Sequence, residues 1–459
     1  MRFSIAHLSF MAAIVALAAP SADVLATDPV AWKAGVAKTV ITPERPMWMS
    51  GYSSRDHAAE GKLHDLWAKA LVLEDATGGR AVLVTLDLVG IDRVLSLAIR
   101  GELETKYGLK KSQVAINCSH THTGPVVGHN LRAMYFLDEQ QSRLIDEYTA
   151  GLQAKVIAVV GEAIKNLAPA TLAWADGNAT FAVNRRTNLE PEVPKLAAEG
   201  KLKGPVDHDV PVLAVKDMAG KLKTVVFGYA CHATALSFYQ WTGDWPGFAQ
   251  IDLEREHPGT VAMFWAGCGA DQNPLPRRTV ELAEKYGQKM SDAVDQVLAG
   301  ELTPVAGRLH TSYDEIDLPF ATLPTNEELK TQAASSDKYQ AARAKLLLAQ
   351  IDGGQPLSPT YPYPIEVWRL GDGPVMITLG GEVVVDYALR LKAELPNERV
   401  WVAGYTNDVM AYIPSRRVLT EGGYEGASAM IFYGLPTSWA PEVEESIIRE
   451  VRKQVATKP

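Results

Sequence analysis

Strand-like and helix-like segments alternate along most of this chain of 459 residues, and the alternation limits the folds open to it. Apolar runs typical of buried strands lie at 81–87, near Val114, and at 212–215, 224–229 and 261–265. Amphipathic segments predict helices at 93–107, 140–166 and 282–298. Strands that alternate with helices in this way favour an α/β domain whose helices cover a sheet.

The alternation of strand-like and helix-like segments continues in the second half of the chain, after one segment of different character. Residues 326–351 are rich in Ala, Lys, Gln and Leu and lie between Pro- and Gly-containing stretches, which predicts a helical insertion. Strands are expected at 365–370, 375–379 and 400–403, and Gly380 to Glu382 is expected to open a helix that runs to about Glu394. We therefore expect a single large α/β domain with mixed sheets flanked by helices.

The N-terminus carries a separate pattern. Arg2 precedes a short apolar run at 10–19, and Val24-Leu25-Ala26 supplies the small residues of a cleavage site. Residues 1–26 are therefore predicted to be a signal peptide and residues 27–459 the mature domain, which implies a secreted or periplasmic protein. An uncleaved anchor is the alternative, although the run is too short to span a bilayer comfortably. No later segment has the length and hydropathy of a transmembrane helix.

Composition excludes several other classes. The chain is 47% hydrophobic and 22% charged, as in globular proteins, and its net charge of −9 without a basic cluster argues against a nucleic-acid partner. Its three cysteines, Cys118, Cys231 and Cys268, are too few for a disulfide framework. Cys118 and Cys231 are expected to lie near each other, either as buried fillers or as one disulfide.

His120 and His122 follow the strand expected near Val114 and precede the loop signal Gly124-Pro125. In an extended backbone, two side chains two residues apart point to the same side. Imidazole is the commonest metal ligand and a proton shuttle near neutral pH. By itself the pair also fits a hydrogen-bonded structural role. A metal or catalytic site is indicated only if other segments supply further ligands or catalytic groups.

Three further segments offer such partners at the ends of expected strands. They carry His232, Glu382 and Tyr412. Two histidines, a carboxylate and an open position form a frequent arrangement for catalytic zinc. Each residue alone also has a structural interpretation: His232 and Tyr412 as core side chains, and Glu382 as a charge at a helix N-terminus.

Several motifs, in order along the chain, resemble the neutral/alkaline, non-lysosomal ceramidase family. They are Ala37 to Pro43 with Ser50-Gly51-Tyr52, His120 to Pro125, Gly243-Asp244 with Gly247-Phe248-Ala249, Gly381-Glu382, and Tyr412 with Tyr424 to Ser428. The resemblance implies one Zn²⁺ per chain, held by His120, His232, Glu382 and Tyr412. It also implies that His122 is the catalytic histidine, that Arg185 lies in the pocket with Arg186 as a rival for that role, and that Tyr424 lines the pocket.

Two features depart from the family pattern. Asn273 stands where the family has an active-site serine before a proline, and asparagine forms hydrogen bonds but is no nucleophile. Since about thirty residues follow Ser428, we also expect the small C-terminal β-sandwich domain of typical neutral ceramidases to be missing. Both departures weaken the expectation of ceramide more than the expectation of a zinc hydrolase.

The expected function is a secreted zinc-dependent amidohydrolase that cleaves the N-acyl amide of ceramide or a related N-acyl lipid by metal-activated water. Asn273, Arg185 and Tyr424 would contact the substrate, and Asp244 would either orient a ligand histidine or cap a loop. The expected partner is a small-molecule or lipid substrate, with room for peripheral contact with a membrane surface. The alternatives are a zinc hydrolase of the same fold that acts on another amide or ester, and a non-catalytic binding protein.

Overall fold

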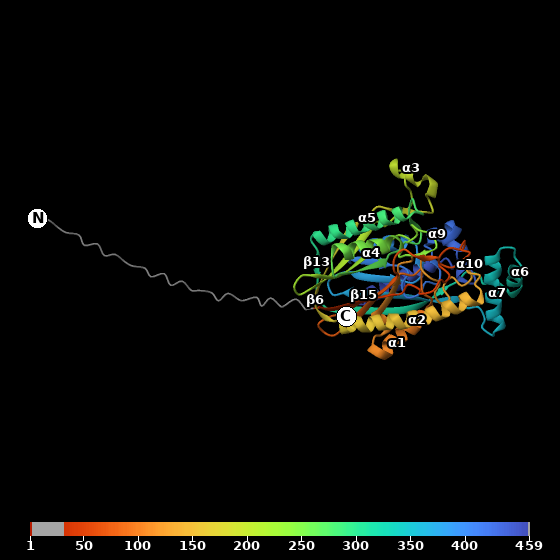
Figure 1. Ribbon diagram of the computed structural model, residues 1–459, viewed down its shortest axis with the longest axis horizontal. Helices are drawn as coiled ribbons and strands as arrows, with labels where there is room; N and C mark the ends of the chain where they lie inside the picture. Colours follow the sequence, from red (N-terminus) through yellow and green to blue (C-terminus); the bar gives the residue numbers. More distant parts are fainter. Residues whose placement is uncertain (2–31, 458–459) are drawn as a thin grey trace.

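Two β-sheets form the centre of the structure, a computed structural model that describes Met1 and residues 32–457 (Figure 1). The signal peptide predicted at 1–26 therefore lies, apart from Met1, outside the described residues. The larger sheet has the strand order β11-β9-β8-β6-β1-β3-β4-β5, and β13 pairs with β6 beside this path. Its strands are β1 (Trp32–Val40), β3 (Trp67–Glu74), β4 (Arg80–Leu86), β5 (Val114–Cys118), β6 (Ala168–Asn178), β8 (Asp209–Asp217), β9 (Leu222–Tyr229), β11 (Val261–Ala266) and β13 (Thr303–Val305).

The smaller sheet has the order β14-β15-β16-β18. Its strands are β14 (Leu309–Pro319), β15 (Thr360–Leu370), β16 (Val375–Leu379) and β18 (Val400–Ala403). Both sheets are mixed, since β4–β5, β9–β11 and β16–β18 pair in parallel and the other neighbours in antiparallel. Short ladders join β2 (Gly61–Lys62) to β10 (Gln240–Trp241), β7 (Ala182–Asn184) to β12 (Gln272–Pro274), and β17 (Glu382–Val383) to β19 (Tyr412–Ile413).

The two sheets pack face to face, and helices cover their outer faces. In β9, Val225 and Phe227 pack on the helix side, whereas Val226 belongs to the cluster between the sheets with Trp368 and Trp401. The larger sheet is covered by α1 (Arg93–Tyr107), α2 (Glu139–Lys165), α4 (Asp244–Glu256) and α5 (Val280–Ala299), and the smaller by α8 (Asp386–Glu394) and α11 (Val443–Ala456). This helix–sheet–sheet–helix order confirms the predicted mixed α/β class.

The helical insertion predicted at 326–351 is also confirmed. It consists of α6 (Asn326–Ala333) and α7 (Lys338–Asp352), which join β14 to β15 and project at one end of the molecule (Figure 1). A small core of Leu329, Ala344 and Leu347 holds the two helices together, apart from the larger cores. The remaining helical segments are η1 (Lys111–Gln113), η2 (Glu190–Glu192), α3 (Val193–Ala198), α9 (Arg416–Glu421), η3 (Tyr424–Ser428) and α10 (Met430–Tyr433).

The structure corrects the expected start of one helix and settles the state of the cysteines. The helix expected from Gly380 begins only at Asp386, because Glu382 and Val383 pair as a short parallel strand with Tyr412 and Ile413. The cysteines are all free and buried, so Cys118 and Cys231 act as core fillers and form no disulfide. Across residues 32–457, none of the helices combines the length and hydropathy that crossing a membrane requires.

Candidate metal centre

The two histidines of the first motif lie in a turn that follows β5. The backbone of His120 is left-handed, with φ of 60°, and its N–H donates to the carbonyl of Leu88. His122 follows in the same turn, where its N–H donates to the carbonyl of Ala233, just after His232. The expected extended backbone is therefore wrong at this point. The turn itself brings the imidazole rings together, at 4.8 Å between their centroids.

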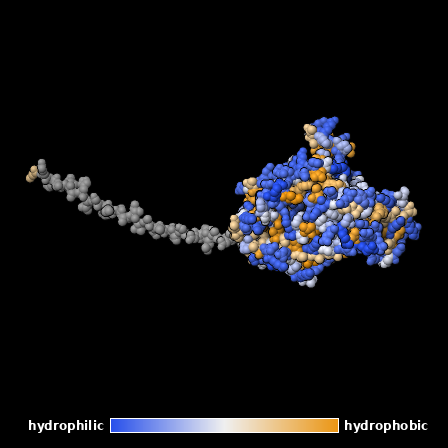
Figure 2. All heavy atoms as spheres, viewed as in Figure 1, coloured by the Kyte–Doolittle hydropathy of each residue, from blue (hydrophilic) through white to orange (hydrophobic). Residues whose placement is uncertain are grey.

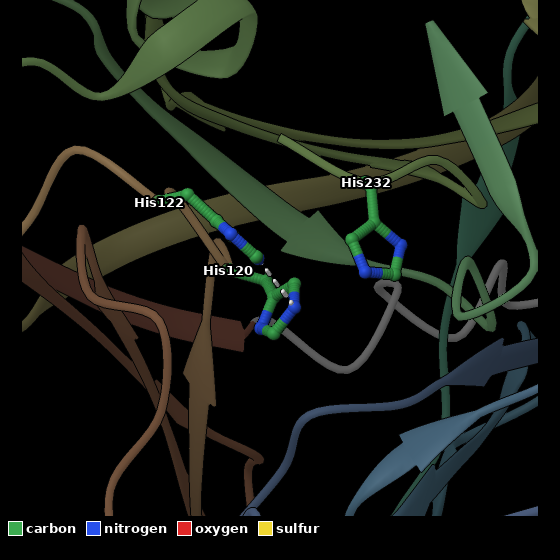
Figure 3. A group of neighbouring side chains, drawn as sticks. All are labelled: His120, His122 and His232. Atoms are coloured by element: carbon green, nitrogen blue, oxygen red, sulfur yellow. Dashed lines mark hydrogen bonds between the residues drawn. The ribbon is translucent and has the colours of Figure 1, made fainter. Parts of the chain in front are cut away.

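Three imidazole rings and one carboxylate converge in the interior. The Nε2 atoms of His120 and His122 are 3.2 Å apart, and each of the three histidines offers a ring nitrogen within 4.8 Å of the others (Figure 3). The Oε2 atom of Glu382 lies 3.0 Å from His120 Nε2 and 3.3 Å from His232 Nε2. The three histidines come from loops after β5 and β9, and Glu382 begins the short strand β17 that follows β16.

The hydrogen bonds of two histidines show which ring nitrogens are free to bind a metal. Nδ1 of His120 lies 2.6 Å from the carbonyl oxygen of Val89, and Nδ1 of His232 lies 2.6 Å from that of Gly269. A carbonyl only accepts, so each Nδ1 carries a proton and donates it, and each ring turns its Nε2 toward the interior of the cluster. Burial, and next the charge of Arg185, lower the pKa of His232 to about 4, which keeps that ring neutral at neutral pH.

These donors fit a metal ion. Glu382 Oε2 is buried and accepts no hydrogen bond, while Tyr433 donates a short hydrogen bond to Glu382 Oε1. Burial opposes ionisation of Glu382, yet His120 and His232 outweigh it and hold the pKa of this carboxyl well below its usual range. An ionised carboxylate oxygen 3.0 and 3.3 Å from two ring nitrogens requires positive charge between them, from a ring proton or from a metal ion. Nitrogen and oxygen donors held by carbonyl partners are typical of a protein metal site.

Tyr412 completes this set of donors from the neighbouring strand. The β17–β19 ladder pairs Glu382 with Tyr412, and the Tyr412 hydroxyl lies 3.5 Å from His232 Nε2. Arg185 Nη2 donates to the same hydroxyl at 3.1 Å. Burial and the charge of Glu382 raise the pKa of Tyr412 well above its usual range, and Arg185 opposes this shift.

His122 differs from the other two histidines. Its Nδ1 is buried without a hydrogen-bond partner, although the residue as a whole is half-buried. The Tyr52 ring packs against its imidazole at 4.7 Å between centroids. Burial, followed by the charges of His120 and His232, lowers the pKa of His122 well below its usual range. The ring is thus neutral near pH 7 and has no fixed partner for its Nδ1.

Arg185, and not Arg186, lies beside the cluster. Arg185 donates from Nε to Glu425 at 2.7 Å and from Nη1 to the side-chain oxygen of Asn273 at 3.3 Å. Arg186 turns away from Tyr412 and donates to Glu425, Glu421 and the Gly422 carbonyl. Burial disfavours the charge of Arg185, but Tyr412 and Glu425 outweigh it and raise the pKa of Arg185 above its usual range.

All eight residues named from the sequence lie in one network of contacts. The structure buries His120, His232, Asn273, Glu382 and Tyr412, leaves His122 and Arg185 half-buried, and exposes Tyr424. The Tyr424 ring lies 5.2 Å from that of Tyr412. These three side chains therefore mark the side on which the cluster comes closest to the molecular surface.

Sequence reasoning missed two buried partners and left one role open. Tyr433 binds Glu382, and no spacing in the sequence singles it out. Glu425 binds Arg185; it lies in the Tyr424 to Ser428 motif, but the motif assigned it no role. Asp244 accepts hydrogen bonds from the backbone N–H groups of Ala235 and Leu236, so it caps the loop after His232 and orients no histidine ring.

The fold and this cluster define a class: mixed α/β proteins whose strand-end loops assemble a buried histidine–carboxylate centre of the kind that holds a catalytic metal ion. Residues 32–307 match the family described as neutral/alkaline non-lysosomal ceramidase, N-terminal. The chain belongs to this family, as its motifs indicated.

Individual relatives agree with this assignment. The neutral ceramidase of Pseudomonas aeruginosa is 26% identical over 88% of this chain and 70% of that protein. Neutral ceramidase 2 of Arabidopsis thaliana is 33% identical over a shorter stretch, 21% of this chain and 13% of that protein. The crystal structure of the Pseudomonas aeruginosa neutral ceramidase matches with a TM-score of 0.70 at 22% identity, over 92% of this chain and 74% of that one, which shows a shared fold.

Proposed function

We propose that this protein is a secreted or periplasmic zinc-dependent amidohydrolase that cleaves the N-acyl amide of ceramide or a related N-acyl lipid. The observation that carries the proposal is the unpartnered Oε2 atom of Glu382 between His120 and His232. Membership of the ceramidase family and the names of its relatives support hydrolysis of an amide. Residues 1–26 would be removed on export, and residues 27–459 would act as one hydrolase domain.

His120, His232, Glu382 and Tyr412 would hold one Zn²⁺. Two neutral imidazoles, a carboxylate and a phenol oxygen suit zinc, which binds nitrogen and oxygen donors and keeps one position open in catalytic sites. When bound, Zn²⁺ lowers the pKa of a coordinated water to about 7 and polarises a carbonyl oxygen. The chain's own residues would then orient the amide and move the protons.

His122 would carry the proton. Its low pKa keeps the imidazole unprotonated at neutral pH, so it is ready to accept a proton from the attacking water. When the amide C–N bond breaks, the same ring would return the proton to the leaving amine nitrogen. The ring is half-buried, and its Nε2 points toward the cluster beside His120 Nε2, so this nitrogen would exchange the proton with both groups.

Arg185, Asn273 and Tyr424 would contact the substrate around the carbonyl. Arg185 is held in place by Glu425, and the side-chain oxygen of Asn273 accepts from Arg185 and, at 3.4 Å, from Thr234. With its oxygen held, Asn273 is free to donate from its amide nitrogen. A well-placed donor to the developing oxyanion is worth roughly 3 kcal/mol.

A row of aromatic rings supports a substrate with a hydrocarbon chain. It leads from Tyr424 through Phe432 and Tyr339 to Phe136, with ring centroids 6.2, 5.1 and 5.7 Å apart. Tyr424 and Phe136 are large hydrophobic residues exposed by 42% and 49%. Hydrophobic side chains also gather in patches on the face shown in Figure 2. Such surfaces suit a lipid substrate and peripheral contact with a membrane.

The test pairs metal content with hydrolysis. Zinc per chain, measured by mass spectrometry, and turnover of short- and long-chain fluorescent ceramides are compared for the wild type, His232→Ala and His257→Ala. His257 is a half-buried histidine that bonds Asp295, outside the cluster, so its variant is the matched control. We expect one zinc and hydrolysis in the wild type and control, with both lost in His232→Ala.

Two other results would redirect the assignment. Zinc without ceramide turnover would retain the metal site and favour a hydrolase of another amide or ester, consistent with Asn273 at the family's serine position. Bound zinc and no turnover across a broad amide and ester panel would favour a binding protein. Absence of zinc from the wild type would refute the mechanism.

A further inference from the structure

Arg55 is a buried arginine with no carboxylate beside it. Only 7% of the residue is exposed, and no Asp or Glu among the described residues forms an ion pair with it. Its guanidinium lies between two tyrosine rings, 5.3 Å from that of Tyr52 and 4.9 Å from that of Tyr239. Burying a cation without a counter-ion costs free energy. The hydrogen bonds of the Arg55 guanidinium indicate what this buried cation contributes to the structure.

Those contacts join the two loops that carry the histidines. Arg55 Nη2 donates to the backbone carbonyl of His122 at 2.8 Å, and Nη1 donates to the carbonyl of Phe238 at 3.1 Å. The first loop also holds His120, and the second follows His232. Hydrogen bonds from a charged donor are roughly twice as strong as neutral ones, so one side chain links both loops firmly.

The neighbours of Arg55 in sequence enclose the His122 ring. A Cβ atom added to Gly51 would lie 2.4 Å from His122 Nδ1, so the glycine backbone lies directly against the imidazole. Tyr52 packs on the ring and donates from its hydroxyl to the Leu236 carbonyl at 2.9 Å. The rings of His120 and His232 are fixed by Nδ1 hydrogen bonds, whereas His122 has none. Apart from the contact of its Nε2 with His120 Nε2 at 3.2 Å, the orientation of His122 therefore comes from packing and from its backbone.

We propose that Arg55 is a positioning residue for His122: it fixes the His122 carbonyl and thereby aims the imidazole without touching the substrate. The inference rests on the proposed function only where it concerns the proton that His122 carries. The placement of the ring is a structural claim of its own. A side chain that positions a catalytic group through its backbone adds no further hydrogen bond to the ring, so Nδ1 of His122 keeps no fixed partner.

The direct test is the crystal structure of zinc-loaded Arg55→Gln beside that of the zinc-loaded wild type. We expect the His122 ring to shift by about 1 Å, while His120, His232 and Glu382 keep their places. An unmoved His122 would overturn the proposal, whatever the substrate proves to be. This readout needs no activity, so it separates a failure of the positioning role from a failure of the proposed function.

Kinetics provide the second readout on whichever amide the wild type hydrolyses. Misplacement of a catalytic group by about 1 Å lowers turnover about 100-fold. Arg55→Gln should therefore lose kcat by that order, with KM and zinc content unchanged. Arg55→Ala should regain part of its kcat when guanidinium is added at millimolar concentration, because the ion refits the site between the tyrosine rings.

The matched control is Arg343→Gln. Arg343 is 9% exposed, has no carboxylate partner among the described residues and lies in α7, where it bonds Gln332. It should keep the wild-type kcat and gain nothing from guanidinium. If both arginine variants lose kcat in proportion to a fall in Tm, Arg55 has a structural role only and the proposal is wrong.

Discussion

His120 adopts a left-handed backbone conformation directly after β5, and this single dihedral angle decides how the first motif is used. Residues other than glycine rarely have positive φ, and such strain concentrates at functional sites. Asp244 and Asn407 share the feature, with φ of 56° and 66°. The motifs pointed to side chains that the fold brings together, and their role as metal donors stays a prediction. The sequence could not predict the turn, because the partners that stabilise it, such as the Leu88 carbonyl, lie elsewhere in the chain.

Asp244 offers a residue-scale prediction about the loop that carries His232. Asp244→Ala removes the acceptor for three backbone N–H groups, those of Ala235, Leu236 and Trp245. Leaving buried donors unsatisfied costs about 1–3 kcal/mol each when nothing replaces the partner. We expect the free energy of unfolding to fall by about 3 kcal/mol and zinc affinity to fall about 10- to 100-fold. Denaturant titration and competition with a zinc chelator measure the two effects.

Asp244→Asn is the matched variant for that experiment. Asparagine tolerates positive φ and keeps one acceptor oxygen. Its loss in the free energy of unfolding should therefore be less than half of the loss in Asp244→Ala. Equal losses in the two variants would show that the carboxylate charge, and not the capping geometry, matters at this position.

Asp408 makes stability depend on pH. Burial raises its pKa to about 7 from an ordinary 3.8, against the hydrogen bond from Tyr361 and the charge of Arg93. Between these two values the folded protein keeps a proton that the unfolded chain releases, so the contribution of this carboxyl falls as pH rises from about 4 to 7. Asp408→Asn removes the effect. The free energy of unfolding of Asp408→Asn minus that of the wild type should be larger at pH 8 than at pH 4, by on the order of 3 kcal/mol. Urea unfolding at both pH values checks this, and a gain independent of pH would contradict it.

At the scale of elements, local signals predicted most boundaries. The helices expected at 93–107 and 140–166 appear as α1 and α2, where Asp92 and Asp138 cap the first turns through Leu95 and Gln141 N–H groups. The two-residue strand β17 was missed, and a helix was expected there. Its partner Tyr412 is distant in sequence, and two residues give no periodic pattern.

The α6–α7 insertion should behave as a unit of low local stability. Its core contains few buried residues, and its link to the rest includes the Tyr339 hydroxyl on the Ser53 carbonyl at 2.7 Å. Leu347→Ala should lower the opening free energy of residues 326–352 by about 2–4 kcal/mol, with zinc content unchanged. Hydrogen exchange read by mass spectrometry should show faster exchange in this segment alone.

Leu391→Ala provides the contrast for the insertion. Leu391 is fully buried in α8, in the main core, so its truncation should lower protection throughout both sheets. If Leu347→Ala also lowered protection in α2 or the larger sheet, the insertion would be part of the cooperative core.

For the whole molecule, the candidate metal should stabilise the fold, because its donors come together only in the native state. A ligand present at about 1,000 times its Kd adds about 4 kcal/mol to the free energy of unfolding. Removing zinc by EDTA should therefore lower Tm by about 5 °C in the wild type and in His257→Ala. His232→Ala should show no response to EDTA. A wild-type Tm that ignores both EDTA and added zinc would argue against a metal at this centre.

The Asn117 side chain at the end of β5 joins parts of the chain that are far apart. Its amide nitrogen donates to the carbonyl of Gly404, 287 residues away, at 2.8 Å, and its oxygen accepts from the N–H of Ala266 at 2.9 Å. Contacts of such long sequence separation form late and slowly in folding. His120 and Glu382 face each other across the same junction, so no folding intermediate with separated sheets contains their site. A metal ion bound at this centre would therefore not template the early steps of folding in this chain; it would bind only the finished structure.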